Sequence, residues 1–207
     1  MKKTANFYYD ILSPFSYLFL KQRQSLEDRL ELVPVPIFLP GILKIQNNMG
    51  PAEVPAKRNH TYEFCVWQAS LLGVKFKMPR KHPFSSSAVQ RLLLKHSADF
   101  PMLDKAFDFV WAQGGDIDAG WAEFCQCIGL SADTPKPTDE AVKTQLVKNT
   151  NQAAQRGVFG VPTVSIDNRI FFGCDSIDWI HQYLDDPNLF NNPEYLDVLD
   201  IENPLVK

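Results

Sequence analysis

The order in which apolar runs meet proline and glycine constrains the fold of this chain more than any other feature of its sequence. Residues 5–12 (ANFYYDIL) form an aromatic and apolar run of strand type, and Ser13-Pro14 follow at once. Serine is a favoured N-cap, and proline is favoured at the first helical position because its missing N–H would be unpaired anyway. We therefore predict a strand, a tight turn and a helix over 14–28.

A second strand and a long loop are expected next. Residues 30–38 (LELVPVPIF) have strand character, but Pro34 and Pro36 cannot donate backbone hydrogen bonds and favour a sheet edge or an early end. With the preceding strand and helix they form a β-α-β unit, whose crossover implies a parallel pair of strands. Residues 40–56 hold several prolines and glycines and are predicted to be a long irregular loop, which in compact domains is usually functional or disordered.

The middle of the chain has the periodicity of helices. Trp121, Phe124, Cys125 and Ile128 follow one another at helical spacing and define one apolar face. Serines are placed to cap the helix that begins near residue 85, and a glycine closes the longest amphipathic pattern. We predict helices over the following ranges: 56–73, 85–97, 102–114, 120–129 and 138–157.

Strand character returns toward the end of the chain. Residues 162–166 (PTVSI) and 169–173 (RIFFG) flank Asp167-Asn168, a two-residue turn signal that predicts a β-hairpin. A final helix is expected over 174–186.

The order of elements predicts the fold class. Without the middle helices the chain reads β-α-β-α-β-β-α, the arrangement of a thioredoxin fold. We therefore predict an α/β protein in which a thioredoxin-like domain carries a large all-helical insertion. The predicted division is 1–45 and 136–186 for the discontinuous thioredoxin-like domain, 46–135 for the helical insertion and 187–207 for an extended C-terminal tail.

Composition narrows the classes of partner. The net charge of −3 over 207 residues argues against a nucleic-acid-binding protein, which needs a basic surface to neutralise phosphates. No apolar run approaches the ~20 residues that cross a bilayer, so no membrane partner is expected. The lysines and apolar residues at the start mimic a secretory signal, but Asp10 and Pro14 interrupt the apolar region, and we predict a mature N-terminus. The 4 scattered cysteines predict no disulfide framework and favour a cytoplasmic location.

The first motif that indicates chemistry is Ser13-Pro14-Phe15-Ser16 at a strand-to-helix junction. With cysteine at both serine positions it would read C-P-x-C, the redox pair of thioredoxin-like oxidoreductases. A helix N-terminus favours an anion, and a serine hydroxyl there can donate a hydrogen bond to the thiolate of a bound small molecule. An ordinary N-cap is the alternative. Disulfide exchange is excluded, because neither serine has a sulfur.

The second motif is VFGVPTV, which contains Val161-Pro162 before a strand. Thioredoxin-like folds hold a cis-proline at such a place. A cis bond would leave the backbone N–H and C=O of Val161 free to pair with an extended peptide. The alternative is a trans proline that starts the strand.

The third motif is FFGCD, where Cys174-Asp175 precede the final helix. Asp175 or Ser176 is expected to cap that helix. The functional alternative is that Asp175 binds an ammonium group on a ligand.

The fourth motif is the loop GILKIQNNMGPAEVPAKR. Its polar residues Lys44, Asn48, Lys57 and Arg58 are expected at the mouth of the same site. Simple solvation of each side chain is the alternative.

The cysteines and histidines do not predict a metal site. Cys125 lies on an apolar helix face and Cys127 points elsewhere, so both are expected to be structural thiols. The histidines lack metal-ligand spacing; they are His60, His82, His96 and His181.

Together the four motifs resemble a known family. FYYDILSPFSYL, GILK with N-x-x-PAEVPAK, VFGVPT and FFGCD stand in the order found in kappa-class glutathione transferases and 2-hydroxychromene-2-carboxylate isomerases, and the resemblance reaches to about residue 186. It implies a thioredoxin-like fold with a helical insertion, glutathione as cofactor and a homodimer. It also implies a small aromatic electrophile or keto-acid as substrate, and hence a role in aromatic catabolism.

The resemblance also implies roles for individual residues. Ser13 corresponds to the serine that hydrogen-bonds the glutathione sulfur. The implied glutathione-binding residues are Ser13, Pro14, Phe15, Asn48, Lys57, Val161, Pro162, Cys174 and Asp175. The family often has serine or another small polar residue where this chain has Cys174, so that contact is expected through the backbone.

The leading hypothesis is a glutathione-dependent isomerase. The glutathione thiolate would add reversibly to an unsaturated aromatic keto-acid and would not be consumed. The substrate carboxylate is expected to meet one of the cations Lys44, Lys57, Lys81 and Arg91. The alternatives are a kappa-like transferase that releases a conjugate, and a noncatalytic module that binds glutathione or a peptide.

Overall fold

A four-stranded mixed sheet forms the centre of the computed structural model, which describes residues 2–205. The strand order is β2-β1-β3-β4, with β1 and β2 parallel and the other pairs antiparallel. The strands are β1 (Lys3–Tyr9), β2 (Leu30–Pro36), β3 (Thr163–Ile166) and β4 (Arg169–Phe172). The predicted parallel pair and C-terminal hairpin are therefore confirmed, as is the thioredoxin-like α/β fold class.

The prolines of β2 lie where the sequence placed them, on an edge of the sheet. Only β1 pairs with β2, and the strand ends at Pro36 rather than at residue 38. Pro34 is tolerated because one side of an edge strand needs no ladder donor.

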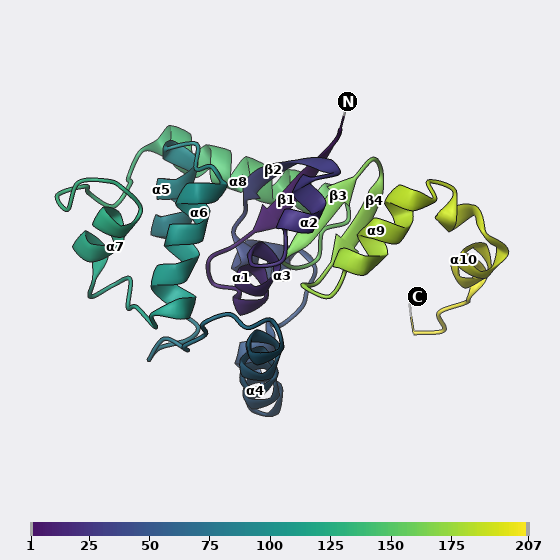
Figure 1. The fold of residues 1–207 in the computed structure, drawn as a ribbon, viewed down its shortest axis with the longest axis horizontal. Coiled ribbons are helices and arrows are strands. Elements are labelled where there is room, and N and C mark those ends of the chain that lie inside the picture. The colour runs from purple at the N-terminus through teal and green to yellow at the C-terminus, as the bar shows by residue number, and fades with distance from the viewer. Residues whose placement is uncertain (1, 206–207) are drawn as a thin grey trace.

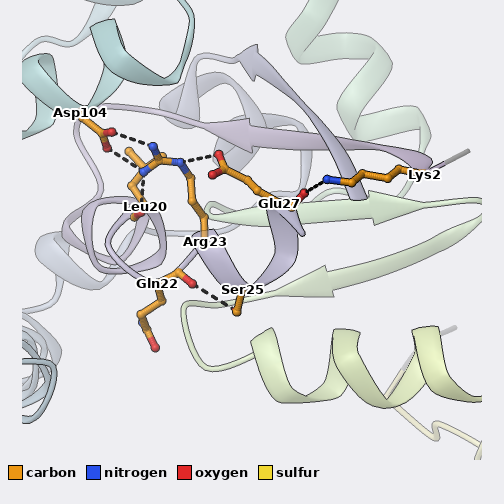
Figure 2. Close-up of polar contacts among 7 residues, drawn as sticks. All are labelled: Lys2, Leu20, Gln22, Arg23, Ser25, Glu27 and Asp104. Atoms are coloured by element: carbon orange, nitrogen blue, oxygen red, sulfur yellow. Dashed lines mark hydrogen bonds and ion pairs between the residues drawn. The ribbon is translucent and has the colours of Figure 1, made fainter. Parts of the chain in front are cut away.

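The predicted single helix over 14–28 is wrong, because the chain breaks into α1 (Pro14–Leu20) and α2 (Gln24–Glu27). The Arg23 guanidinium lies at the break and donates to the Leu20 carbonyl at 2.7 Å. It also forms ion pairs with Glu27 on α2 and Asp104 on a distant helix (Figure 2). A long-range ion pair thus fixes the turn that ends α1.

The predicted irregular loop over 40–56 is also wrong in part. Residues Leu39–Ile45 form α3, a 3-10 turn spans Pro51–Glu53, and α4 begins at Pro55. Gly41 allows α3 to approach the later helix α8 (Glu140–Gln155), because an added Cβ would lie 3.1 Å from Thr150 Cγ2. The segment between α3 and the 3-10 turn remains irregular.

The predicted middle helices are confirmed, with boundaries shifted by a few residues. Gly73 and Gly157 have positive φ angles of 64° and 87° just beyond the ends of α4 and α8. In Figure 1, α5, α6 and α7 gather on the side of the sheet away from the C-terminal tail, and α4 stands below α1. The elements are α4 (Pro55–Leu71), α5 (Ser87–Lys95), α6 (Phe100–Phe107), a π-helical turn η2 (Asp108–Ala112), α7 (Trp121–Cys127) and α8 (Glu140–Gln155).

The C-terminal tail is not extended as predicted. After α9 (Ile177–Asp185) the chain forms 3-10 turns at Leu189–Asn191 and Val198–Asp200 around α10 (Pro193–Asp197). The reason is aromatic packing: the Phe190 ring lies among aromatic rings of β4 and α9 and 5.1 Å from the ring of Tyr195 on α10. Figure 1 shows the tail at the end of the molecule opposite α7.

Successive side chains of β1 point to opposite faces of the sheet and belong to two separate apolar clusters. Phe7 and Tyr9 point into the main core, which is shared with α1, α5 and α6. Tyr8 points to the other face and joins a small cluster under α3 and α8: Tyr8, Ile37, Ile42, Ala153, Val158 and Val161. The main core includes residues of both the predicted thioredoxin-like domain and the predicted helical insertion. The domain boundaries stay a prediction.

Within residues 2–205 no helix is long and apolar enough to span a membrane.

Candidate functional site

Ser13 begins α1 in a tight turn that follows β1. Its N–H donates to the Asp10 carbonyl at 3.0 Å, and its Oγ accepts from the Ser16 N–H at 3.3 Å. The predicted N-cap is therefore confirmed. Ser13 is 5% exposed, so its hydroxyl lies in a largely enclosed position.

The first and second motifs meet at this hydroxyl. Ser13 Oγ donates to the Val161 carbonyl at 3.2 Å, and the Val161–Pro162 peptide bond is cis. The N–H groups of Val161 and Phe15 make no hydrogen bond in the described part of the chain. One exchangeable hydroxyl and two unpaired backbone donors therefore gather at the start of α1.

The third motif is joined to the second through Gly173. Its N–H donates to the Pro162 carbonyl at 3.0 Å, and its φ angle is 102°. This φ lies in the region that L side chains rarely adopt, so glycine is favoured here, and an added Cβ would also displace the flexible carboxylate of Asp175. Ser176 is the N-cap of α9, but its hydroxyl donates to the Gly173 carbonyl rather than to a helical N–H.

Cys174 and Asp175 face different surroundings. Cys174 is 3% exposed, and burial raises the pKa of its thiol to about 12, so the thiol stays neutral. Its carbonyl accepts from Gln22 Nε2 at 3.4 Å. Asp175 is exposed and makes no ion pair or side-chain hydrogen bond to any residue that the structure describes. The roles of Asp175 and Cys174 in glutathione binding stay predictions.

Asn48 and Lys57 are not joined to the Ser13 turn. Both are exposed, and the Asn48 side chain accepts from the neighbouring Met49 N–H at 2.8 Å. Lys57 lies in the first turn of α4, which packs on α1 through rings of Phe64 and Phe15 6.1 Å apart. Their contact with glutathione stays a prediction.

Asp10, which the sequence analysis did not single out, fixes the start of the turn. It is fully buried, and its carboxylate accepts from the Leu12 N–H at 3.0 Å, the Leu39 N–H at 2.8 Å and Ser86 Oγ at 3.0 Å. Desolvation raises its pKa from 3.8 to about 6 despite these donors. Ser86 is the N-cap residue of α5, as expected for a serine, but its hydroxyl donates to Asp10 and makes no capping hydrogen bond.

Side chains of the helical region hold the peptide groups before Ser13. Gln90 on α5 accepts from the Ile11 N–H at 3.3 Å and donates to the Tyr9 carbonyl at 3.0 Å. Trp111 Nε1 donates to the Ile11 carbonyl at 2.9 Å. The turn is therefore held from outside as well as by its own bonds.

His82 also holds the turn, by a hydrogen bond to Leu12, the residue next to Ser13. Its Nε2 lies 2.9 Å from the Leu12 carbonyl, which can only accept, so Nε2 carries the hydrogen. Its Nδ1 lies 2.7 Å from the Tyr62 hydroxyl and accepts from it in the neutral ring. Burial lowers the pKa of His82 and keeps the ring neutral near pH 7. No local pattern reveals this contact, which spans 70 residues.

Ser16 is buried at 0% exposure, and its Oγ has no hydrogen-bond partner in residues 2–205. An unpaired buried hydroxyl costs about 1–3 kcal/mol.

Among the described residues no group of three or more His, Cys, Asp or Glu side chains is placed to hold a metal ion.

The sheet, the Ser13 turn and the proline loop define a thioredoxin-like class of protein. More specifically, the chain belongs to the DsbA-like thioredoxin domain family, whose model matches residues 4–185. It is 30% identical to the 2-hydroxychromene-2-carboxylate isomerase of Sphingobium xenophagum over 198 residues, covering 89% of this chain and 99% of the relative. It is 28% identical to glutathione S-transferase kappa 1 of Rattus norvegicus over 204 residues, covering 85% and 88%.

A solved structure of 2-hydroxychromene-2-carboxylate isomerase has the same fold, with a TM-score of 0.75 and 21% identity over 91% of this chain and 97% of that one. The resemblance read from the motifs is therefore confirmed. The prediction that the chain is an enzyme is confirmed, because its relatives are named as an isomerase and a glutathione transferase.

Proposed function

We propose that this protein is a glutathione-dependent isomerase that acts on an unsaturated aromatic keto-acid. The observation that carries the proposal is the hydrogen bond from the Ser13 hydroxyl to the Val161 carbonyl. It lies at a helix start where no cysteine is present. The isomerase relative, which is matched over 99% of its length, favours this reaction over transfer. When bound, glutathione supplies the thiolate nucleophile for reversible addition and is regenerated.

The residues present fit glutathione. Unpaired polar groups at the site match what a γ-glutamyl peptide offers: the Val161 N–H for a peptide carbonyl and the Asp175 carboxylate for an ammonium group. The Ser13 hydroxyl would donate to the sulfur instead of to the Val161 carbonyl, and that carbonyl would then be free to accept a peptide N–H. Pro14, Phe15 and Pro162 form the walls. Cys174 binds through its backbone, and Asn48 and Lys57 supply polar contacts at the mouth.

Thiolate stabilisation is the task of the α1 start. Ser13 Oγ–H and the unpaired Phe15 N–H both donate toward an anion there. The positive end of a helix acts within its first turn, so the short length of α1, 7 residues, still permits this effect. Together these donors lower the pKa of a bound thiol from its usual ~8.5.

The remaining parts of the proposal concern the assembly and the cell. We expect a homodimer, a role in aromatic catabolism and a cytoplasmic location. The 4 free thiols Cys65, Cys125, Cys127 and Cys174 are compatible with a reducing compartment, where glutathione is abundant.

One assay separates the candidate reactions. Interconversion of the isomers of a chromene-type aromatic acid is followed with glutathione far below the substrate concentration. Many turnovers per glutathione support the isomerase. Stoichiometric consumption with formation of a conjugate supports the transferase, and an absence of turnover with any electrophile, despite glutathione binding, supports the noncatalytic module.

A further inference from the structure

A second pocket of about 580 Å³ lies where α3, α5 and α8 meet. Its apolar lining residues are Phe38, Ile45, Leu146 and Val147. None of its lining residues belongs to the Ser13 turn or to the Pro162 loop. The volume lies in the range of small-molecule sites, roughly 300–1,000 Å³. It is therefore a separate candidate binding site.

Each of the three helices brings one cation to this pocket. Lys44 lies in the last turn of α3, Arg91 lies on α5 and Lys143 lies on α8, and no acidic residue is among the described residues that line the pocket. Lys44 and Arg91 form no ion pair within residues 2–205. Lys143 pairs only with Glu140 at 3.3 Å, and both side chains are largely exposed, so the pair is weak. The pocket thus has an uncompensated positive charge.

The Arg91 guanidinium is already held in place. Its Nε donates to the Ser87 carbonyl at 3.0 Å, and Nη2 lies 3.4 Å from Ser87 Oγ. A guanidinium has five N–H donors in a planar fork, so donors remain for a ligand. That fork matches the two oxygens of a carboxylate or sulfonate. Arg91 is therefore a preorganised site for the head of an organic anion.

Apolar side chains are exposed directly beside these cations. Ile45 is 50% exposed and Val147 is 53% exposed, although both line the same pocket as the Phe38 ring. Single exposed apolar residues are ordinary, but apolar residues and cations that line the same pocket are suited to a ligand with an apolar body and an anionic head.

We propose that this pocket binds a small amphiphilic organic acid, with its carboxylate on Arg91 and Lys44 and its apolar body on Phe38, Ile45 and Val147. A second copy of the chain fits less well, because a two-fold interface through this face would bring like charges together. Lys44 and Arg91 are two of the cations predicted to meet the carboxylate of the isomerase substrate, but they line this pocket, which shares no residue with the Ser13 turn, so the proposal does not rest on the glutathione function.

The experiment titrates 2-naphthoate into the protein by calorimetry while S-hexylglutathione blocks the Ser13 site. Binding of one naphthoate per chain is expected, with an uncharged naphthylmethanol binding at least tenfold more weakly. Arg91→Gln is expected to weaken naphthoate binding roughly tenfold or more, and Lys44→Gln a few-fold, since charge-assisted hydrogen bonds are lost. Lys44 is exposed, so Lys44→Gln keeps the test valid if Arg91→Gln fails to fold.

Matched controls are available on α8 and at the residue just beyond its end. Lys148→Gln and Arg156→Gln remove exposed cations that do not line the pocket and should leave naphthoate binding unchanged. Equal losses in these controls, displacement of naphthoate by S-hexylglutathione, or no binding at all would overturn the proposal. Co-sedimentation with phosphatidylglycerol vesicles that Arg91→Gln abolishes would overturn it in favour of a lipid surface. Glutathione binding, titrated separately, reports on the other function.

Discussion

The Asp10–Ser13 turn and the segment between Asn47 and Lys57 are expected to bind the same ligand, yet the protein holds them very differently. The turn is buried; it donates a hydrogen bond to Gln90 and accepts hydrogen bonds from His82 and Trp111, all in the helical region. The other segment is largely exposed and is bonded mainly to itself.

This difference predicts that the two segments have different roles in catalysis and in binding. A turn that is fixed before the ligand arrives positions a reacting atom without further ordering. A segment that is ordered by the ligand spends part of its binding energy on lost side-chain freedom. Substitutions in the turn should therefore act on turnover or stability, and substitutions in the exposed segment should act weakly and on affinity.

The largest effect is expected from Ser13→Ala. Loss of a donor that stabilises a reacting anion typically lowers kcat by about 10²–10³-fold. Glutathione affinity should change by less than about fivefold, because the backbone contacts remain, and the pKa of bound glutathione should rise in a thiolate absorbance titration. Loss of the N-cap costs roughly 1 kcal/mol of stability, which is measured in parallel. Equal losses in kcat and affinity, or in neither, would exclude thiolate activation by Ser13.

Asp10→Asn should give the next largest effect, on stability. Its carboxylate accepts three donors, whereas an amide offers one oxygen, so the variant should lose about 1–3 kcal/mol of unfolding free energy near pH 4, where the wild-type carboxyl is neutral, and less at pH 7, where the buried charge itself costs stability. The wild-type carboxyl has a pKa raised from 3.8 to about 6, so the folded state binds the proton more tightly. Its contribution to stability therefore increases as the pH falls from about 6 toward 3.8, and the variant should lack this dependence. Urea unfolding of both proteins across this range provides the measurement; identical pH profiles would contradict the assignment.

His82→Gln should change the pH dependence in the opposite direction. The pKa of His82 lies below its ordinary 6.5, so the unfolded chain binds the proton more tightly, and this contribution to stability is lost as the pH falls through 6.5. Glutamine keeps an N–H for the Leu12 carbonyl but does not titrate. The stability difference between wild type and variant should shrink from pH 7.5 to about 5.5. His82→Leu, which removes the donor, should in addition lower kcat; unchanged kcat would show that Leu12 needs no external donor.

The sequence predicted local features of the site well and long-range ones poorly. The N-cap at Ser13 and the turn at Gly173 depend on neighbouring residues, and both are visible in a short pattern. The break after Leu20 depends on Asp104, which lies 81 residues from Arg23, and the Ser86 hydroxyl serves Asp10, 76 residues away. Such pairs have no periodicity, so only the folded chain reveals them.

Small effects are expected from Asn48→Ala and Lys57→Ala. Exposed polar contacts contribute about 0.2–1 kcal/mol, so glutathione affinity should fall by no more than about fivefold, with kcat unchanged. The Lys57 effect should diminish at high salt, because exposed charges are screened. Lys148→Ala, on the exposed face of α8, is the matched control and should change nothing. A loss of turnover in Asn48→Ala would show that the exposed segment also positions the reacting atoms.

The smallest effect is expected one helical turn beyond Ser13, at Ser16. Its buried hydroxyl has no partner in residues 2–205, and alanine is the better helix former. Ser16→Ala should therefore leave the free energy of unfolding unchanged or raise it by up to about 1 kcal/mol, with kcat and glutathione affinity within about twofold of wild type. Urea unfolding and steady-state kinetics check both statements. A loss of turnover without a loss of stability would show that this hydroxyl reaches the bound sulfur, and the preorganised region would then extend from the Asp10–Ser13 turn into α1.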